Sequence, residues 1–124
     1  MTIQAFGTWR GLALVVGTGG IGSALAAAIR LRCPGLTVVT AGRQGPPHQT
    51  LTLDLENDTD LEGLSAALQG FDLPLRLVVN TSGRLHGPGL RPEKRLSQVA
   101  RAALMEQFSI NAIAPVLLAR AIEP

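Results

Sequence analysis

Six residues near the N-terminus have the spacing of a turn that holds phosphate groups. Gly17-Thr18-Gly19-Gly20-Ile21-Gly22 matches G-x-G-x-x-G and lies between an apolar run and an Ala- and Leu-rich stretch. In such a turn the first glycine permits a tight bend, the second lets the backbone approach a pyrophosphate, and the third lets a helix pack close to a strand. Free N–H groups and the dipole at the helix start then hold the phosphates. The context favours a dinucleotide site, and the alternative is a strand-to-helix turn that binds nothing.

The residues after the second apolar run indicate which nucleotide would bind. No Gly-Lys-Ser/Thr follows the turn, which disfavours a P-loop. A domain that binds S-adenosylmethionine and a dehydrogenase selective for NAD both tend to place an acid here, whereas this chain has Ala41-Gly42-Arg43. The Arg43 guanidinium suits the extra 2′-phosphate of NADP through charge-assisted contacts. We therefore expect NADP, with NAD as the second choice; the other interpretation of Arg43 is an exposed loop residue.

The elements that would position these residues alternate between strands and helices. Short runs rich in Leu, Val and Thr predict four strands, at 12–16, 36–40, 51–55 and 75–80. Helical composition and spacing, with candidate caps and stop signals, predict helices at 23–32, 58–69 and 96–122, the last with Pro115 as a kink or a new start. This order predicts a Rossmann-type α/β/α fold with a parallel sheet, as a single partial domain over residues 1–124 that stops after the fourth strand and its helix.

Composition excludes several classes of function. The 124 residues carry a net charge of +2 without clustering, and we interpret the segment Arg91–Arg95 as solvated rather than as a nucleic-acid site. The single Cys33 cannot form an internal disulfide, and no signal peptide or apolar run of about 18 residues is visible. The residues show no metal-ligand spacing, and His48 and His86 are predicted to be loop residues without catalytic duty. We expect a cytoplasmic protein with no metal, membrane or nucleic-acid partner.

Taken together, the motifs resemble the short-chain dehydrogenase/reductase family over roughly residues 11 to 122. Its features occur in the expected order: the glycine turn, Arg43, Asp54-Leu55 after the third strand, Asn80-Thr81-Ser82-Gly83 after the fourth, and Asn111 in the following helix. Within the family, the segments 91–94 and 111–115 are most similar to the C-factor-like branch. The turn departs from the family pattern, because it is one residue shorter than usual. Thr81 and Ser82 also stand where the family has Asn and Ala.

The resemblance implies a role for each of these residues. Asp54 would bind the adenine amino group and Leu55 would supply a backbone contact, while Asn80 to Gly83 would line the adenine-ribose site. Asn111 would anchor a water molecule in the family's proton relay. The alternatives are a cap for Asp54, a turn former for Asn80 and a buried structural amide for Asn111.

The resemblance also implies catalytic residues that this chain does not contain. The family uses a Tyr, a Lys four residues later and a Ser about a dozen residues earlier, all beyond the helix that follows the fourth strand. The chain has no Tyr, and its only Lys is Lys94. We therefore expect the NAD(P)(H)-binding part of an oxidoreductase that acts on a carbonyl or alcohol, either a fragment of a longer chain or part of a homo-oligomer. The alternatives are a non-catalytic nucleotide-binding module or remnant, and more weakly a transferase that uses S-adenosylmethionine.

Overall fold

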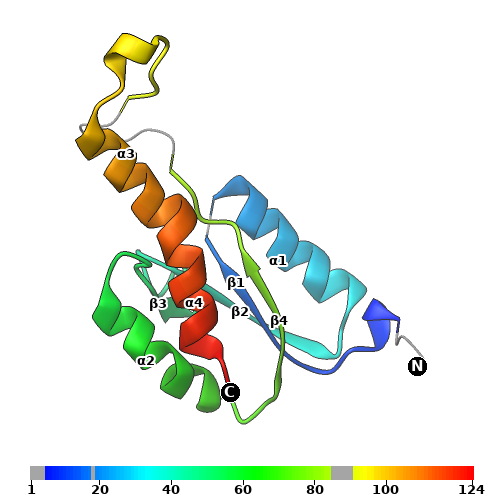
Figure 1. Cartoon of the computed structure of the whole chain (residues 1–124). Coiled ribbons are helices and arrows are strands. Elements are labelled where there is room, and N and C mark those ends of the chain that lie inside the picture. Colours follow the sequence, from blue (N-terminus) through cyan, green and yellow to red (C-terminus); the bar gives the residue numbers. More distant parts are fainter. Residues whose placement is uncertain (1–4, 18, 85–90) are drawn as a thin grey trace.

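Four parallel strands form a sheet with helices on both of its faces (Figure 1). The computed structural model describes residues 5–17, 19–84 and 91–124. The strands are β1 (Gly11–Val16), β2 (Leu36–Gly42), β3 (Leu51–Thr52) and β4 (Leu75–Asn80), in the spatial order β3-β2-β1-β4. This order and the parallel pairing confirm the predicted Rossmann-type α/β/α fold, because right-handed crossovers place alternate helices on opposite faces.

β1 is the centre of the sheet and of both hydrophobic layers. All six of its residues are buried. Leu12, Leu14 and Val16 face one cluster, and the residues between them, Ala13 and Val15, face the other. Burial on both sides explains why the run is continuously apolar instead of alternating.

One helix covers the first face and two helices cover the second. α1 (Gly20–Arg32) packs through Ala26 and Ile29 with Ala13 and Val15. α2 (Asp58–Gln69) and α4 (Ala114–Ile122) pack against the opposite face through residues that include Leu64 and Leu118. The chain before β1 contains a short 3₁₀ turn, η1 (Phe6–Thr8).

The ends of α1 and α2 differ from the sequence prediction by a few residues. α1 begins at Gly20 rather than Ser23, because its first turn is formed by the glycine motif itself. The cap of α2 is Asn57, whose side chain accepts hydrogen bonds from the N–H groups of Thr59 and Asp60. Asp58, Thr59 and Asp60 are the first helical residues, where the helix dipole favours the two carboxylates.

The third strand is shorter than expected. Only Leu51–Thr52 pair with β2, opposite Ala41 and Gly42. Leu53 and Leu55 are buried, but they lie in the turn that leads into α2 and not in the ladder. The alternation of apolar residues in 51–55 therefore predicted correctly which residues are buried, but it overestimated the length of the strand.

The expected helix from Leu96 to Ile122 begins later and is distorted in the middle. Residues Leu96–Gln98 form a 3₁₀ turn, η2, and α3 (Arg101–Phe108) follows it. A π-helical turn, η3 (Ser109–Ile113), joins α3 to α4. The prediction that Pro115 kinks the helix or begins a new one is half right, since Pro115 lies in the first turn of α4, but the helical backbone continues into α4 from the π-helical turn.

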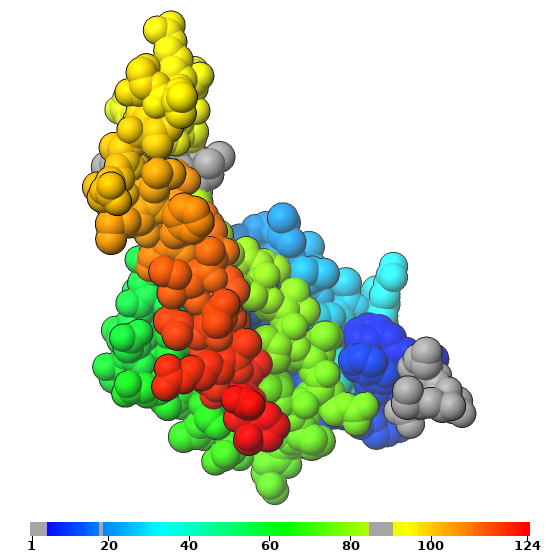
Figure 2. Space-filling view, viewed as in Figure 1, coloured from blue at the N-terminus to red at the C-terminus, as the bar shows by residue number. Residues whose placement is uncertain are grey.

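The C-terminal helix is unevenly covered. Arg101–Ile122 is a helix of 22 residues that is long and apolar enough, by length and composition alone, to cross a membrane. Its second half packs on α2, and Ile110, Ala114 and Leu118 are core residues. Figure 2 shows its first half, with the segment before it, extending away from the body of the molecule. The second half is therefore a core helix, and most of the first half is exposed to solvent.

Candidate functional site: a pocket at the carboxyl ends of the strands

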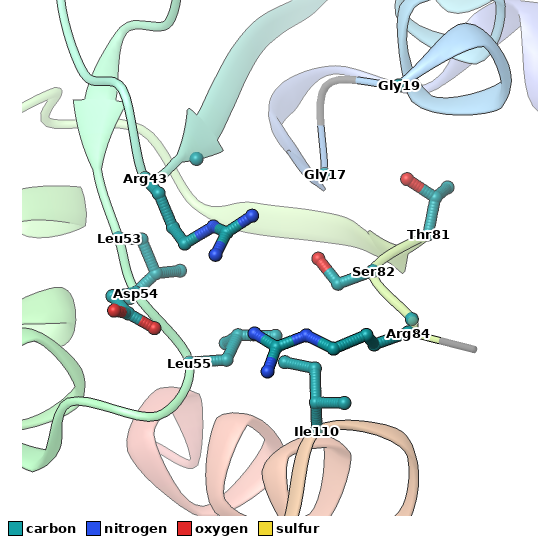
Figure 3. A pocket seen from close by; sticks show the side chains of 12 residues that line it. Gly17, Gly19, Arg43, Leu53, Asp54, Leu55, Thr81, Ser82, Arg84 and Ile110 are labelled. Carbon is teal, nitrogen blue, oxygen red and sulfur yellow. The ribbon is translucent and has the colours of Figure 1, made fainter. Parts of the chain in front are cut away.

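A cavity of about 260 Å³ opens where the chain order of the sheet reverses. β1 lies between β2 and β4, so the loops after β1 and β4 diverge there, which is the usual ligand position in open α/β sheets. Figure 3 shows that the cavity is enclosed by the glycine turn, the loops after β2, β3 and β4, and the C-terminal helix. The lining residues are Gly17, Gly19, Gly42, Arg43, Leu53, Asp54, Leu55, Thr81, Ser82, Gly83, Arg84 and Ile110.

The glycine turn needs two of its glycines for the fold itself. Gly17 has a φ of 101°, and its N–H donates to the carbonyl of Ala41 at 3.0 Å. A Cβ on Gly22 would collide with the backbone carbonyl of Gly17. These two positions therefore match the predicted tight bend and the close packing of helix on strand. Thr18 lies outside the described residues.

The middle of the turn faces open space. Apart from its chain neighbours and its own helix backbone, a Cβ built on Gly19 or Gly20 would meet no atom of the residues that the structure describes within 4 Å. Gly19 is the N-cap of α1 and, as a glycine, it has no side chain that could cap the first N–H groups of this helix. An uncapped helix start beside open space is the arrangement that binds a pyrophosphate.

Not every residue of the motif reaches the cavity. Gly17 and Gly19 line it, whereas Gly20, Ile21 and Gly22 do not. The Ile21 side chain is 72% exposed on the first turn of α1. A contact between a ligand and Gly20 or Ile21 would therefore involve backbone groups, which stays a prediction.

Arg43 follows β2, and its side chain extends into the cavity. Figure 3 shows its guanidinium in the space between the Gly17 turn and the loop that carries Asp54. The residue is exposed, and among the described residues the one ion pair joins two other side chains. Its charge is thus uncompensated and available to an anionic group, as predicted for a 2′-phosphate.

Asp54 and Leu55 form the β3 side of the cavity. The Asp54 N–H donates to Asp60 Oδ2 at 2.8 Å, and Asp54 Oδ1 accepts from the N–H of Glu56 at 3.0 Å. The carboxylate is therefore partly used as a turn cap, which was the alternative interpretation, and Oδ2 accepts no hydrogen bond from the described residues. Leu55 is 4% exposed and belongs to the core, and it also lines the cavity, so the backbone contact with a ligand stays a prediction.

The segment after β4 is fixed against the end of β1. The backbone N–H and the hydroxyl of Thr81 both donate to the carbonyl of Val16, at 2.8 and 2.9 Å. Asn80 Oδ1 accepts from the N–H of Ser82 at 3.0 Å, so Asn80 forms the turn as its alternative interpretation stated. Ser82 and Gly83 line the cavity. A Cβ on Gly83 would lie 3.1 Å from Asn111 Oδ1, so a small residue is needed there.

Asn111 lies in the π-helical turn and holds the backbone of Arg84. Its Oδ1 accepts from the Arg84 N–H at 2.8 Å, and its Nδ2 donates to the Arg84 carbonyl at 2.6 Å. The side-chain amide thus ties the C-terminal helix to the loop after β4. The relay water that the resemblance implies for this residue stays a prediction.

Arg84 and Glu56 were not predicted from the sequence. Arg84 lines the cavity, and its Nη2 lies 2.9 Å from Glu56 Oε1. No periodic pattern links a residue after the third strand to one after the fourth, so only the folded topology reveals the pair. His48 is exposed in the loop after β2, and His86 lies outside the described residues. Within the ranges that the structure describes, no group of three or more His, Cys, Asp or Glu could hold a metal ion.

Comparisons of sequence give no match, and comparisons of structure give many. No model of a protein family matches the chain, and no curated protein is similar to it in sequence. Among solved structures, an oxidoreductase of the short-chain dehydrogenase/reductase type from Brucella ovis has a TM-score of 0.70 and 26% identity, over 91% of this chain and 54% of that one. An actinorhodin polyketide ketoreductase with NADPH has a TM-score of 0.72 and 22% identity, over 91% and 46%.

A carbonyl reductase from chicken fatty liver with bound NADPH has a TM-score of 0.73 and 19% identity, over 94% of this chain and 49% of that one. The chain therefore spans about half the length of the structures it matches. A structure described as a ribose-5-phosphate isomerase from Brucella melitensis matches as well, so the shared fold does not fix the reaction. The expected resemblance is confirmed at the level of the fold.

Proposed function

We propose that this chain, which has the fold of short-chain dehydrogenases/reductases, is the NADP(H)-binding part of an oxidoreductase that acts on a carbonyl or alcohol. The observation that best supports this proposal is that three features meet at one cavity. They are the open glycine turn, the Arg43 guanidinium without a carboxylate partner among the described residues, and the Asp54 carboxylate. Two of the matching structures hold NADPH. NAD remains the second choice of cofactor, and we expect the protein in the cytoplasm.

The residues of the cavity fit the parts of this cofactor. The open space at Gly19 and the uncapped start of α1 suit the pyrophosphate, and Arg43 suits the 2′-phosphate. The adenine would lie between the loop of Asp54 and Leu55 and the segment 81–83. The bound cofactor would supply or accept a hydride, and the residues of this chain would bind and orient it.

Titration of the purified chain with NADPH, NADH and S-adenosylmethionine tests this function. We expect binding of NADPH in preference to NADH, and no binding of S-adenosylmethionine. Circular dichroism establishes that the chain is folded, and calorimetry or NADPH fluorescence measures binding. A folded chain that binds none of the three would contradict the proposal.

The second candidate is a nucleotide-binding module without catalysis of its own. It is favoured by the composition, since the 124 residues include no Tyr and only one Lys. The reading frame after Pro124 discriminates the two. A Tyr-x-x-x-Lys motif there supports an oxidoreductase, whereas a stop codon, with no second chain that supplies the motif, supports the module.

A further inference from the structure

The Glu56–Arg84 ion pair joins two loops that the sheet itself does not join. Glu56 follows β3 and Arg84 follows β4, and these strands lie at opposite edges of the sheet with β2 and β1 between them. Both loops border the cavity. Figure 3 shows the Arg84 side chain running from the β4 side of the cavity toward Leu55. The pair therefore spans the cavity at the end where the adenine is expected.

Hydrogen bonds to neighbouring side chains already hold the backbone of both partners. The Glu56 N–H donates to Asp54 Oδ1 at 3.0 Å. Both backbone groups of Arg84 are bound by the side-chain amide of Asn111, at 2.8 and 2.6 Å. Because the backbone of both partners is already held, this ion pair restricts less chain freedom when it forms than a pair between two loose loops would. Its side chains are also mostly covered, with exposed fractions of 26% for Arg84 and 30% for Glu56.

Few backbone hydrogen bonds join the β3 side of the cavity to the rest of the sheet, although Leu53 and Leu55 are buried in the core. β3 pairs with β2 through only two residues, and Leu53 adds one backbone hydrogen bond to the Gly42 carbonyl, of 2.9 Å. Beyond Leu53 the chain leaves the sheet. An ion pair between Glu56 and the loop after β4 therefore affects the distance between the β3 side and the β4 side of the cavity.

Because of this pair, the two guanidinium groups that line the cavity differ in whether a carboxylate compensates their charge. The charge of Arg84 is compensated by Glu56, whereas Arg43 has no carboxylate partner in the part of the chain that the structure describes. An anionic group is attracted to the uncompensated cation. Arg84 then affects nucleotide binding by holding the two loops in position, and this effect does not depend on the 2′-phosphate.

We propose that the Glu56–Arg84 pair is a strap that sets the width of the adenine end of the cavity and thereby the affinity for NADPH and NADH alike. The inference rests on the proposed nucleotide function. Arg84 and Glu56 are positioning residues in it, and Arg43 alone discriminates between the two nucleotides.

The test combines a measurement without ligand and a measurement with ligand on the full chain. In Glu56→Gln we expect amide hydrogen exchange to accelerate in residues 53–57 and 81–84. We also expect the dissociation constants of NADPH and NADH to rise by a similar factor, about fivefold, with their ratio unchanged. The reversed pair, Glu56→Arg with Arg84→Glu, should restore both quantities toward wild type. Glu62→Gln, which changes an exposed acid on α2, is the matched control and should change neither.

The outcomes separate the strap from the nucleotide function. If the wild-type chain binds neither nucleotide, the proposed function fails. Hydrogen exchange in Glu56→Gln then still tests the ion pair: accelerated exchange shows that the pair holds the loops, and unchanged exchange shows that it does not. If the wild-type chain binds but Glu56→Gln leaves both affinities unchanged, the strap is refuted and the function stands. Tighter NADPH binding by Glu56→Gln also refutes it, because Arg84 would then act through its charge.

Discussion

Gly19 and Gly22 stand in the same turn, but a methyl group added to each would meet different surroundings. At Gly19 the added carbon would meet no atom of the described residues within 4 Å other than those of its chain neighbours, and the backbone there is extended, with φ −68° and ψ −174°. We therefore expect no steric cost from Gly19→Ala, and a loss of about 0.5–1 kcal/mol in the free energy of unfolding, because alanine is a poorer N-cap than glycine. The same methyl group would occupy the space of the pyrophosphate, so NADPH affinity should fall at least about tenfold. Denaturant unfolding and NADPH titration measure the two effects.

Gly22→Ala is the control, because its methyl group would collide with the Gly17 carbonyl and lie 2.8 Å from Thr81 Oγ1. We expect it to destabilise the fold by about 1–3 kcal/mol. A Gly19→Ala chain with unchanged nucleotide affinity would show that the phosphates do not approach the turn.

Arg43 offers the sharpest test of cofactor choice, since its guanidinium lies in the cavity without an acidic partner among the described side chains. Arg43→Ala should weaken NADPH binding by about 10- to 100-fold and NADH binding by less than about threefold, because only NADPH carries the 2′-phosphate. Arg43→Lys should retain part of the preference, since an ammonium group keeps the charge but not the forked geometry. Calorimetric titrations with both nucleotides give the ratio, and an equal loss for both would assign Arg43 to another role.

At the scale of elements, the π-helical turn matters because it carries Asn111 to the loop after β4. Asn111→Ala removes one donor and one acceptor from the Arg84 backbone, so we expect faster exchange of the Arg84 amide and a loss of about 1 kcal/mol of stability. Asn111→Asp should be intermediate, since the carboxylate accepts from the Arg84 N–H and cannot donate to its carbonyl.

Ser109→Ala is the matched control in the same turn, since the Ser109 hydroxyl makes no hydrogen bond within the part of the chain that the structure describes. Hydrogen exchange followed by NMR, together with denaturant unfolding, measures these changes. An Asn111→Ala chain with wild-type exchange at Arg84 would show that the loop is held by other contacts.

The elements also show which features could be predicted from the sequence. β4 was predicted from residue 75 to residue 80 as observed, because an apolar β-branched run between turn residues has one dominant interpretation. Arg43, Asp54 and the segment 81–83 line one cavity, because parallel strands bring their carboxyl ends to one edge, and their roles in binding stay predictions. The π-helical turn and the Glu56–Arg84 pair could not be predicted, since both depend on contacts between segments far apart in the chain.

At the scale of the whole molecule, the C-terminal helix and the neighbouring sheet edge leave apolar surface uncovered. β4 is an edge strand whose apolar residues are only half-buried. The helix exposes Met105 by 65%, Phe108 by 58%, Ile113 by 53% and Val116 by 68%. Apolar surface of this extent beside an open sheet edge favours association with another protein surface.

We therefore predict that the chain, as given, self-associates through this helix. Met105→Glu with Phe108→Glu should shift the molecule toward monomer, because two charges on the exposed face oppose its burial. Leu31→Glu is the matched control, since Leu31 is 81% exposed on α1, on the other face of the sheet, and should leave association unchanged. Sedimentation velocity over a range of protein concentrations measures the state, and circular dichroism verifies that each variant is folded. A wild-type chain that is monomeric at every concentration would contradict the prediction. An equal shift in the Leu31 variant would mean that general surface charge, and not this helix, controls association.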